Sequence, residues 1–406
     1  MDKNASSPQE KGSLGKLFLP SLAVSNFATG PMGVLLGLLL IDISLAFKVS
    51  VGVMGQINTL SYVVAVIFAL FMGVLSVRFK QKSLLIIGLL CVSVSALGCF
   101  IASNFDLMLI SYSLSGVGTA MVFPMATTLI GEHFPLEKRG NAVGWIIAAG
   151  SLSYLIGAPV VGFIAGVGGW RLVLLGFVIP VSLATIFLAL ISVPSTSHGL
   201  KLEIGKRAYL QSFKGVLSNI SATACLIGNA LRTASFVAIV LYGISFFRQR
   251  FSVSTNFASI IILGAALCYT LGSLFAGRLI NKFGRKPLTV LTTLFAGIFI
   301  ISFVFVPNLW LSLVLNFLGT WFSGMGSSAA NSLALEQVPE FRSTMMSINA
   351  AAISLGNALG SAIGGLALVL LDYEVLGSSL GAMGIVAAIM FYLLAIDERR
   401  PGLPKT

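Results

Sequence analysis

The stretch GRLINKFGRK, residues 277–286, places Arg278, Lys282, Arg285 and Lys286 in a short hinge between two long apolar runs. Only 9% of the 406 residues are charged and 57% are hydrophobic, whereas a soluble chain carries about 25% charged residues. This composition indicates a membrane protein. The net charge of +12 does not indicate nucleic-acid binding, because the cations lie in short gaps between apolar runs and not on one basic face.

Apolar runs that can each cross a bilayer recur along the whole chain. Each is near or above the ~20 residues that a helix needs to span ~30 Å of hydrocarbon. Lipid cannot satisfy open backbone groups, so the runs must be helical, and they lack the alternation of a membrane β-barrel. We therefore predict an all-α membrane protein with twelve spans, at 17–42, 52–76, 83–103, 107–131, 142–166, 172–193, 217–246, 256–280, 288–306, 309–335, 345–371 and 377–396.

The cations are distributed unequally between the two sides of these spans. Twenty of the 25 Lys and Arg residues lie on the side of the N-terminus, four lie on the other side, and Arg232 lies within a span. The positive-inside rule then predicts a multi-pass protein of the plasma or inner membrane with both termini in the cytoplasm.

The chain divides into two related halves. Its longest connection, 194–216, is basic and lies at the middle, so we predict a six-helix bundle over 1–193, a cytoplasmic linker over 194–216 and a second six-helix bundle over 217–406. GVLSVRFKQK at 73–82 repeats the opening stretch 204 residues upstream, matching Gly73 with Gly277, Leu75 with Leu279, Arg78 with Lys282, Phe79 with Phe283 and Lys82 with Lys286. Parallel six-span repeats are an architecture of secondary transporters.

Together these features resemble the major facilitator superfamily over essentially the whole chain. That family has Gly-x-Leu-Ala-Asp-Arg-x-Gly-Arg-Lys between its second and third spans, and this chain has Val77 and Asn281 at the position of the Asp. GAPVVG at 157–162 followed by GWR at 169–171 resembles the drug-exporter and sugar-efflux permease branch. The resemblance implies alternating access between two pseudo-symmetric bundles, a small-molecule substrate, the lipid bilayer as surroundings and a monomer.

The repeated loop and the fifth span are candidates for a conformational role. The family's loop Asp pairs across the two halves, which Val77 and Asn281 cannot do. Gly73 and Gly277 are expected to let helices approach closely, although the loop could be only a cytoplasmic anchor and the span-five glycines only static packing. The residues assigned to this role are Gly73, Arg78, Lys82, Gly277, Lys282, Gly284, Arg285, Lys286, Gly157, Pro159 and Gly162.

Arg232 is the charged residue inside a span, where burial costs ~2.5–3.5 kcal/mol. Asn229 and Phe236 share its helix face. We expect Arg232 to face a cavity and bind an anionic substrate; the alternative is a structural Arg bonded to helix carbonyls near the outer interface. In the family, spans one, four, seven and ten line the cavity, which adds as candidates Asn26, Phe27, Tyr112, Met121, Asn316 and Trp321, whose alternatives are helix packing or contact with lipid.

Acidic residues and histidines lie at span ends, in loops or in tails. Asp42, at the end of the first span, is the nearest candidate for proton coupling, and its alternative is a helix end facing water. The predicted function is export of a drug or metabolite, with or without proton coupling; the alternative is uniport or exchange of a small organic anion at Arg232. The sequence has no phosphate loop, zinc spacing or catalytic dyad, so we expect no enzyme, metal or cofactor.

Overall fold

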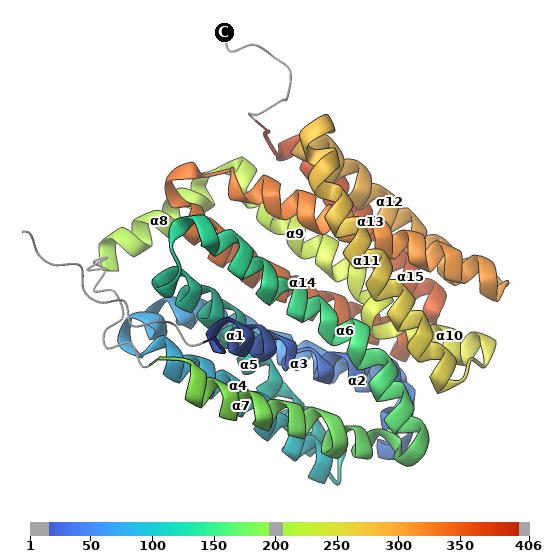
Figure 1. Ribbon diagram of the computed structural model, residues 1–406. Helices are drawn as coiled ribbons and strands as arrows, with labels where there is room; N and C mark the ends of the chain where they lie inside the picture. Colours follow the sequence, from blue (N-terminus) through green and yellow to red (C-terminus); the bar gives the residue numbers. More distant parts are fainter. Residues whose placement is uncertain (1–15, 195–205, 398–406) are drawn as a thin grey trace, which may run out of the picture.

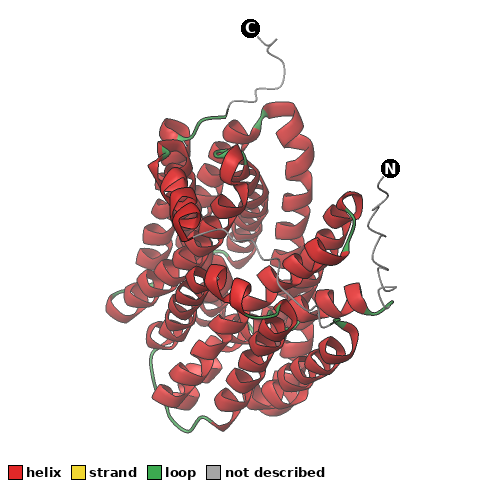
Figure 2. Cartoon of the chain, turned by 90° about the vertical axis from the view of Figure 1, so that its left-hand side faces the viewer, coloured by secondary structure: helices red, strands yellow, loops and turns green. Residues whose placement is uncertain are grey.

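The computed structural model describes residues 16–194 and 206–397, and every regular element in these ranges is helical (Figures 1 and 2). The elements of the first half are α1 (Phe18–Phe27), α2 (Pro31–Phe47), α3 (Val51–Arg78), α4 (Gln81–Ile101), α5 (Phe105–His133), α6 (Leu136–Val173), η1 (Leu174–Val178) and α7 (Ile179–Ser192). Those that follow are α8 (Lys206–Ser218), α9 (Ile220–Val237), η2 (Ala238–Gly243), α10 (Ile244–Phe251), α11 (Thr255–Phe283), α12 (Arg285–Phe305), α13 (Leu309–Leu335), η3 (Pro339–Phe341), α14 (Arg342–Leu370) and α15 (Tyr373–Leu394).

The helices form the predicted twelve spans in two six-helix bundles. Eleven continuous stretches are long and apolar enough to cross a membrane, and one of them, 141–192, has 52 residues. A helix of that length would be about 78 Å long, more than twice the hydrocarbon thickness. The stretch instead turns at Gly168 and Gly169, and Gly169 has φ +76° and ψ −178°. The turn separates spans five and six, which confirms the fold class.

Three spans change geometry along their length: the first, the sixth, which contains η1, and the seventh, which contains η2. The first breaks at Thr29 and Gly30, and Pro31 starts α2 at a position where its missing N–H costs no helix bond. A Cβ atom on Gly30 would lie 1.8 Å from Ser153 Oγ, so the break packs directly against α6. The seventh span runs through α9, η2 and α10. Within the linker, residues 195–205 lie outside the described residues, and 206–218 form α8, a helix that the sequence analysis did not predict.

The bundle has two ends, which we name by their connections. The linker end carries α8 and the connections at 79–80, 134–135 and 336–341, and the far end carries those at 48–50, 252–254 and 306–308 (Figure 1). The halves meet at the far end, where α3 packs on α14 and α6 on α11. A Cβ on Gly52 would lie 2.3 Å from the carbonyl oxygen of Gly365, so these two helices touch through their backbones.

Replacing Gly169 with Ala tests the turn between spans five and six. Its φ and ψ lie in a region that essentially only glycine occupies, so Gly169→Ala should lower the free energy of unfolding by about 1–3 kcal/mol. The measurement is unfolding of the purified protein in mixed micelles by increasing SDS. Gly176→Ala is the matched control, because Gly176 is helical and a Cβ there meets nothing within 4 Å. Equal stability of the two variants would contradict the assignment.

Candidate functional site

A cavity of about 520 Å³ lies between the two halves. Its wall includes residues of α2, α3 and α6 from the first half and of α9, α11, α13 and α14 from the second. Volumes of about 300–1,000 Å³, lined mostly by apolar groups with a few placed polar ones, are typical of small-molecule sites. The size and position of the cavity make it the candidate site.

Arg232 lines this cavity and is only 6% exposed. Its Nε donates to Asn229 Oδ1 at 3.4 Å, Asn229 Nδ2 donates to Asn349 Oδ1 at 2.8 Å, and Asn349 Nδ2 donates to Asn331 Oδ1 at 2.9 Å. This row of amides runs from α9 through α14 to α13 and fixes the position of the guanidinium. Among the described residues, the cations of the ion pairs are Arg248, Arg285 and Arg342, so no carboxylate there neutralises Arg232.

A second polar residue on the wall of this cavity comes from α13. Asn316 is 2% exposed and lines the cavity, and its Nδ2 has no hydrogen-bond partner among the described residues. A buried amide N–H without a partner costs about 1–3 kcal/mol, and this nitrogen has almost no accessible surface, so a ligand acceptor could reach it only after the side chain turns. Beside it the wall is aromatic, because Phe236 stacks on Tyr269 with ring centroids 5.1 Å apart.

The structure brings some of the candidate substrate residues together and not others. Arg232, Phe236, Asn26 and Asn316 line the cavity, Tyr112 lines an adjoining pocket, and Asn229 supports Arg232 from behind. Three others lie elsewhere: Met121 is in the core of the first half, Trp321 packs beside Phe275, and Phe27 is half-buried off the cavity wall.

Sequence reasoning missed ten polar wall residues, among them an amide and three phenols on α3, α6 and α11. Asn58 and Tyr62 come from α3, Tyr154 from α6 and Tyr269 from α11. Asn58 and Tyr62 are four residues apart on one face of a span. That spacing was the available signal.

Asp42 lies in an ion pair between the two halves. Arg248 of α10 faces its carboxylate with both terminal nitrogens: Nη1 contacts Oδ2, and Nη2 donates to Oδ1 at 3.0 Å. Nη1 also donates to the carbonyl oxygen of Leu38 at 3.3 Å. Asp42 therefore forms an ion pair across the far end and does not face only water.

The repeated loops make contacts within each half. Gly284 has φ +89°, which a side chain would strain, and it joins α11 to α12. Asp397 Oδ2 accepts the backbone N–H groups of Arg285 and Lys286 at 3.0 Å each, and Lys82 Nζ donates to the carbonyl oxygen of Leu190 at 2.8 Å. These bonds stabilise helix ends at the linker end.

The glycines and other cations of the conformational motif differ in their surroundings. The expectation of close approach at Gly277 is wrong, because a Cβ there would meet nothing within 4 Å. A Cβ on Gly162 would lie 2.6 Å from Ser259 Cβ in the other half, while one on Gly157 would make ordinary contact with Val34. Pro159 lies inside α6, and Lys282 Nζ lies 5.3 Å from the centroid of the Phe283 ring. The surroundings of Gly73 and the side chain of Arg78 lie outside what the structure describes.

Comparison with known proteins decides the family. The model of the Major Facilitator Superfamily matches residues 22–248 and 224–406. The chain belongs to the major facilitator superfamily. As a superfamily member it is a multi-pass membrane transporter. It is similar to Multidrug resistance protein 2 of Bacillus subtilis, with 27% identity over 76% of this chain and 80% of that one.

Two further likenesses cover nearly the whole chain. The probable 4-methylmuconolactone transporter of Cupriavidus pinatubonensis is 23% identical over 98% of this chain and 92% of that protein. The crystal structure of a D-xylose-proton symporter superposes with a TM-score of 0.77 and 16% identity, covering 95% of this chain and 99% of that one. At this identity the second likeness supports the superfamily fold alone.

Breaking the ion pair between Asp42 and Arg248 should open the far end. Asp42→Asn removes the charge from a partly exposed pair, which is worth about 1 kcal/mol, or roughly fivefold in the ratio of open to closed far ends. Spin labels at Ala46→Cys and Gln249→Cys, both exposed and in opposite halves, report the separation by pulsed electron paramagnetic resonance. We expect a larger population at long distances in Asp42→Asn.

The control is Asp106→Asn, which removes an exposed far-end acid of α5 that has no ion-pair partner among the described residues. Half-exposed Cys91 and Cys268 are replaced by Ala in every sample. The double variant Asp42→Arg with Arg248→Asp should restore short distances. Identical distance distributions in Asp42→Asn and Asp106→Asn would show that the pair does not hold the halves together.

Proposed function

We propose that this superfamily member moves a small organic anion by alternating access and that Arg232 binds the anionic group. The observation that carries this proposal is a buried guanidinium on the cavity wall with no carboxylate partner among the described residues. A ligand carboxylate would supply the missing charge and could accept two parallel N–H bonds from the guanidinium.

The wall of the cavity supports access from the linker end. It includes Phe123 and Ile147 of the first half and Ser327 and Ile353 of the second, all toward the linker end of their helices. Contacts between the halves are concentrated at the far end. With the linker end assigned to the cytoplasm from its cations, the site takes up its substrate from the cytoplasm. This direction, and the similarity to a protein named for multidrug resistance, favour export.

Proton coupling through Asp42 is a second element of the proposal. Protonation would remove the charge that Arg248 contacts and so weaken the closed far end. A proton taken up at Asp42 would thereby favour the state open to the far side, and a proton released would favour closure. Downhill uniport or exchange of one anion for another at Arg232 is the alternative, in which Asp42 serves only as a far-end contact.

Arg232→Ala should strongly weaken substrate binding. Truncating one partner of a buried charged pair costs about 2–5 kcal/mol, so affinity should fall at least about thirtyfold. Radiolabelled small carboxylic acids and their uncharged amides are tested for uptake into proteoliposomes, and only the acids should depend on Arg232. Arg232→Lys should recover part of the activity, because a point charge replaces the planar fork.

Arg250→Ala is the matched control, since Arg250 is exposed at the end of α10. It should transport as the unmodified protein does. Normal uptake of the acids by Arg232→Ala, with the protein inserted to the same level, would reject the proposed site.

Asp42→Asn distinguishes the two energy sources. If Asp42 carries the proton, uptake driven by an imposed pH gradient should be lost, while exchange of labelled for unlabelled acid continues. Both are measured in the same proteoliposome preparation. Gradient-driven uptake that survives in Asp42→Asn would remove Asp42 as the carrier. If flux through the unmodified protein does not change with the imposed pH gradient, the mechanism is uniport or anion exchange.

A further inference from the structure

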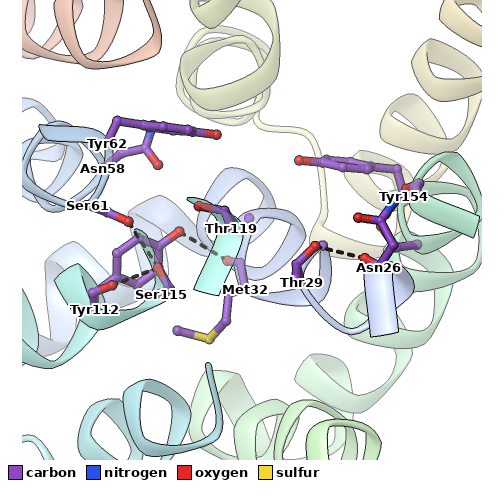
Figure 3. A pocket seen from close by; sticks show the side chains of 14 residues that line it. Asn26, Thr29, Met32, Asn58, Ser61, Tyr62, Tyr112, Ser115, Thr119 and Tyr154 are labelled. Carbon is purple, nitrogen blue, oxygen red and sulfur yellow. Dashed lines mark hydrogen bonds between the residues drawn. The ribbon is translucent and has the colours of Figure 1, made fainter. Parts of the chain in front are cut away.

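A side pocket of about 190 Å³ adjoins the central cavity and is built from the first half alone (Figure 3). An apolar cavity of about 150 Å³ is known to hold a benzene molecule, so this pocket has room for a group of the size of one ring. Six residues line both spaces, which are therefore neighbours: Asn26, Gly33, Asn58, Tyr62, Gly150 and Tyr154.

Three hydroxyl groups of the side pocket already use their protons on the protein. Thr119 Oγ1 donates to the carbonyl oxygen of Gly116 at 3.0 Å, and Thr29 Oγ1 donates to that of Asn26 at 2.8 Å. In the same way Ser153 donates to the carbonyl oxygen of its own helix three residues earlier. A hydroxyl has one proton and two lone pairs, so these oxygens offer the pocket only lone pairs.

Each amide of the pocket uses one of its two N–H groups on the protein. Asn26 Nδ2 donates to the carbonyl oxygen of Ile146 at 2.9 Å, and Asn58 Nδ2 donates to Ser361 Oγ at 2.7 Å. Their Oδ1 atoms make no hydrogen bond with the described residues. Like the hydroxyl oxygens, they are acceptors that a ligand can reach.

Two phenols stand at the boundary between the pocket and the cavity. Tyr62 and Tyr154 line both spaces, and their hydroxyls point toward one another across the opening (Figure 3). No charged side chain is among the described residues that line the pocket. Its chemistry is therefore uncharged and rich in acceptors, with two phenol protons as donors at its opening. The guanidinium of Arg232 in the other half offers donors alone.

We infer that the side pocket binds an uncharged hydrogen-bond-donating group, a hydroxyl on a ring-sized end of the substrate, while Arg232 holds its carboxylate. This inference rests on the proposed function and narrows the substrate class to hydroxylated cyclic carboxylic acids. A ligand ammonium is excluded by the same wall, because a buried cation without a carboxylate partner is costly. A ring without a donor would leave the acceptors of the pocket unsatisfied and displace the water that otherwise fills them.

Matched pairs of ligands test the inference. Benzoate is compared with 4-hydroxybenzoate, and cyclohexanecarboxylate with 4-hydroxycyclohexanecarboxylate, by equilibrium binding to the full chain in lipid nanodiscs. The hydroxylated member of each pair should bind about fivefold more tightly, as expected for one net hydrogen bond. Thr119→Val replaces an exposed hydroxyl of the pocket by a methyl group of similar shape and should reduce that preference to near unity.

The controls separate the pocket from the helix that carries it. Thr128→Val removes another α5 hydroxyl that donates to its own helix, to the carbonyl oxygen of Pro124, outside the pocket, and should keep the preference. Thr119→Ser retains the hydroxyl and should keep it too. Equal affinities within each pair, or a preference that survives Thr119→Val, would mean that the pocket holds only water and would overturn the inference.

Failure of the proposed function gives a different result. If Arg232→Ala binds all four acids as the unmodified protein does, or if none of them binds, the anion site is wrong and the inference fails with it. If binding depends on Arg232 but the hydroxyl has no effect, the anion site stands and the inference alone is overturned.

Discussion

One buried charge constrains the rest of this structure. Arg232 carries a positive charge into a membrane span, at a cost of ~2.5–3.5 kcal/mol on insertion scales, and the described residues provide amides rather than a carboxylate as its neighbours. Amides orient a guanidinium without neutralising it, so its charge remains available to a ligand. Because lipid cannot surround the charge, the helix must turn this face to the space between the halves. The position of the cavity follows from that requirement.

The two ends of the bundle are held by different means. At the far end the halves touch through backbone, as at Gly52 and Gly365, and through the pair of Asp42 and Arg248. At the linker end, the bonds described for the repeated loops remain within one half: Lys82 binds α7, and Asp397 binds the start of α12. Substitution of the loop acid by Val77 and Asn281 fits this division, because neither residue can form an ion pair between the halves.

The sequence determined the fold more fully than the site. Length and apolarity predict spans because lipid imposes one thickness. Since one of the eleven apolar stretches turns at Gly169, these stretches form twelve spans. Arg232 was identifiable because a lone charge in a span has few tolerable surroundings. Neutral polar residues carry no such signal: Asn58 and Tyr62 line the cavity while Trp321 does not, since helix rotation is set by packing against neighbouring helices. The pairing of Asp42 with Arg248 joins residues 206 positions apart, which no local pattern reveals.

The polarity of the site depends on the state of the far end. Asn58 offers its carbonyl oxygen to the side pocket because its amide nitrogen is bound to Ser361 of the opposite half. Separation of the halves at the far end would break that bond and let the amide turn, so that its carbonyl oxygen would no longer be fixed toward the pocket. The same movement would carry Arg232 away from the pocket, because the two belong to different halves. Closure of the far end therefore places the donors of Arg232 opposite the acceptors of the side pocket, and opening would separate them. Release of the substrate would thereby be linked to the movement of the halves.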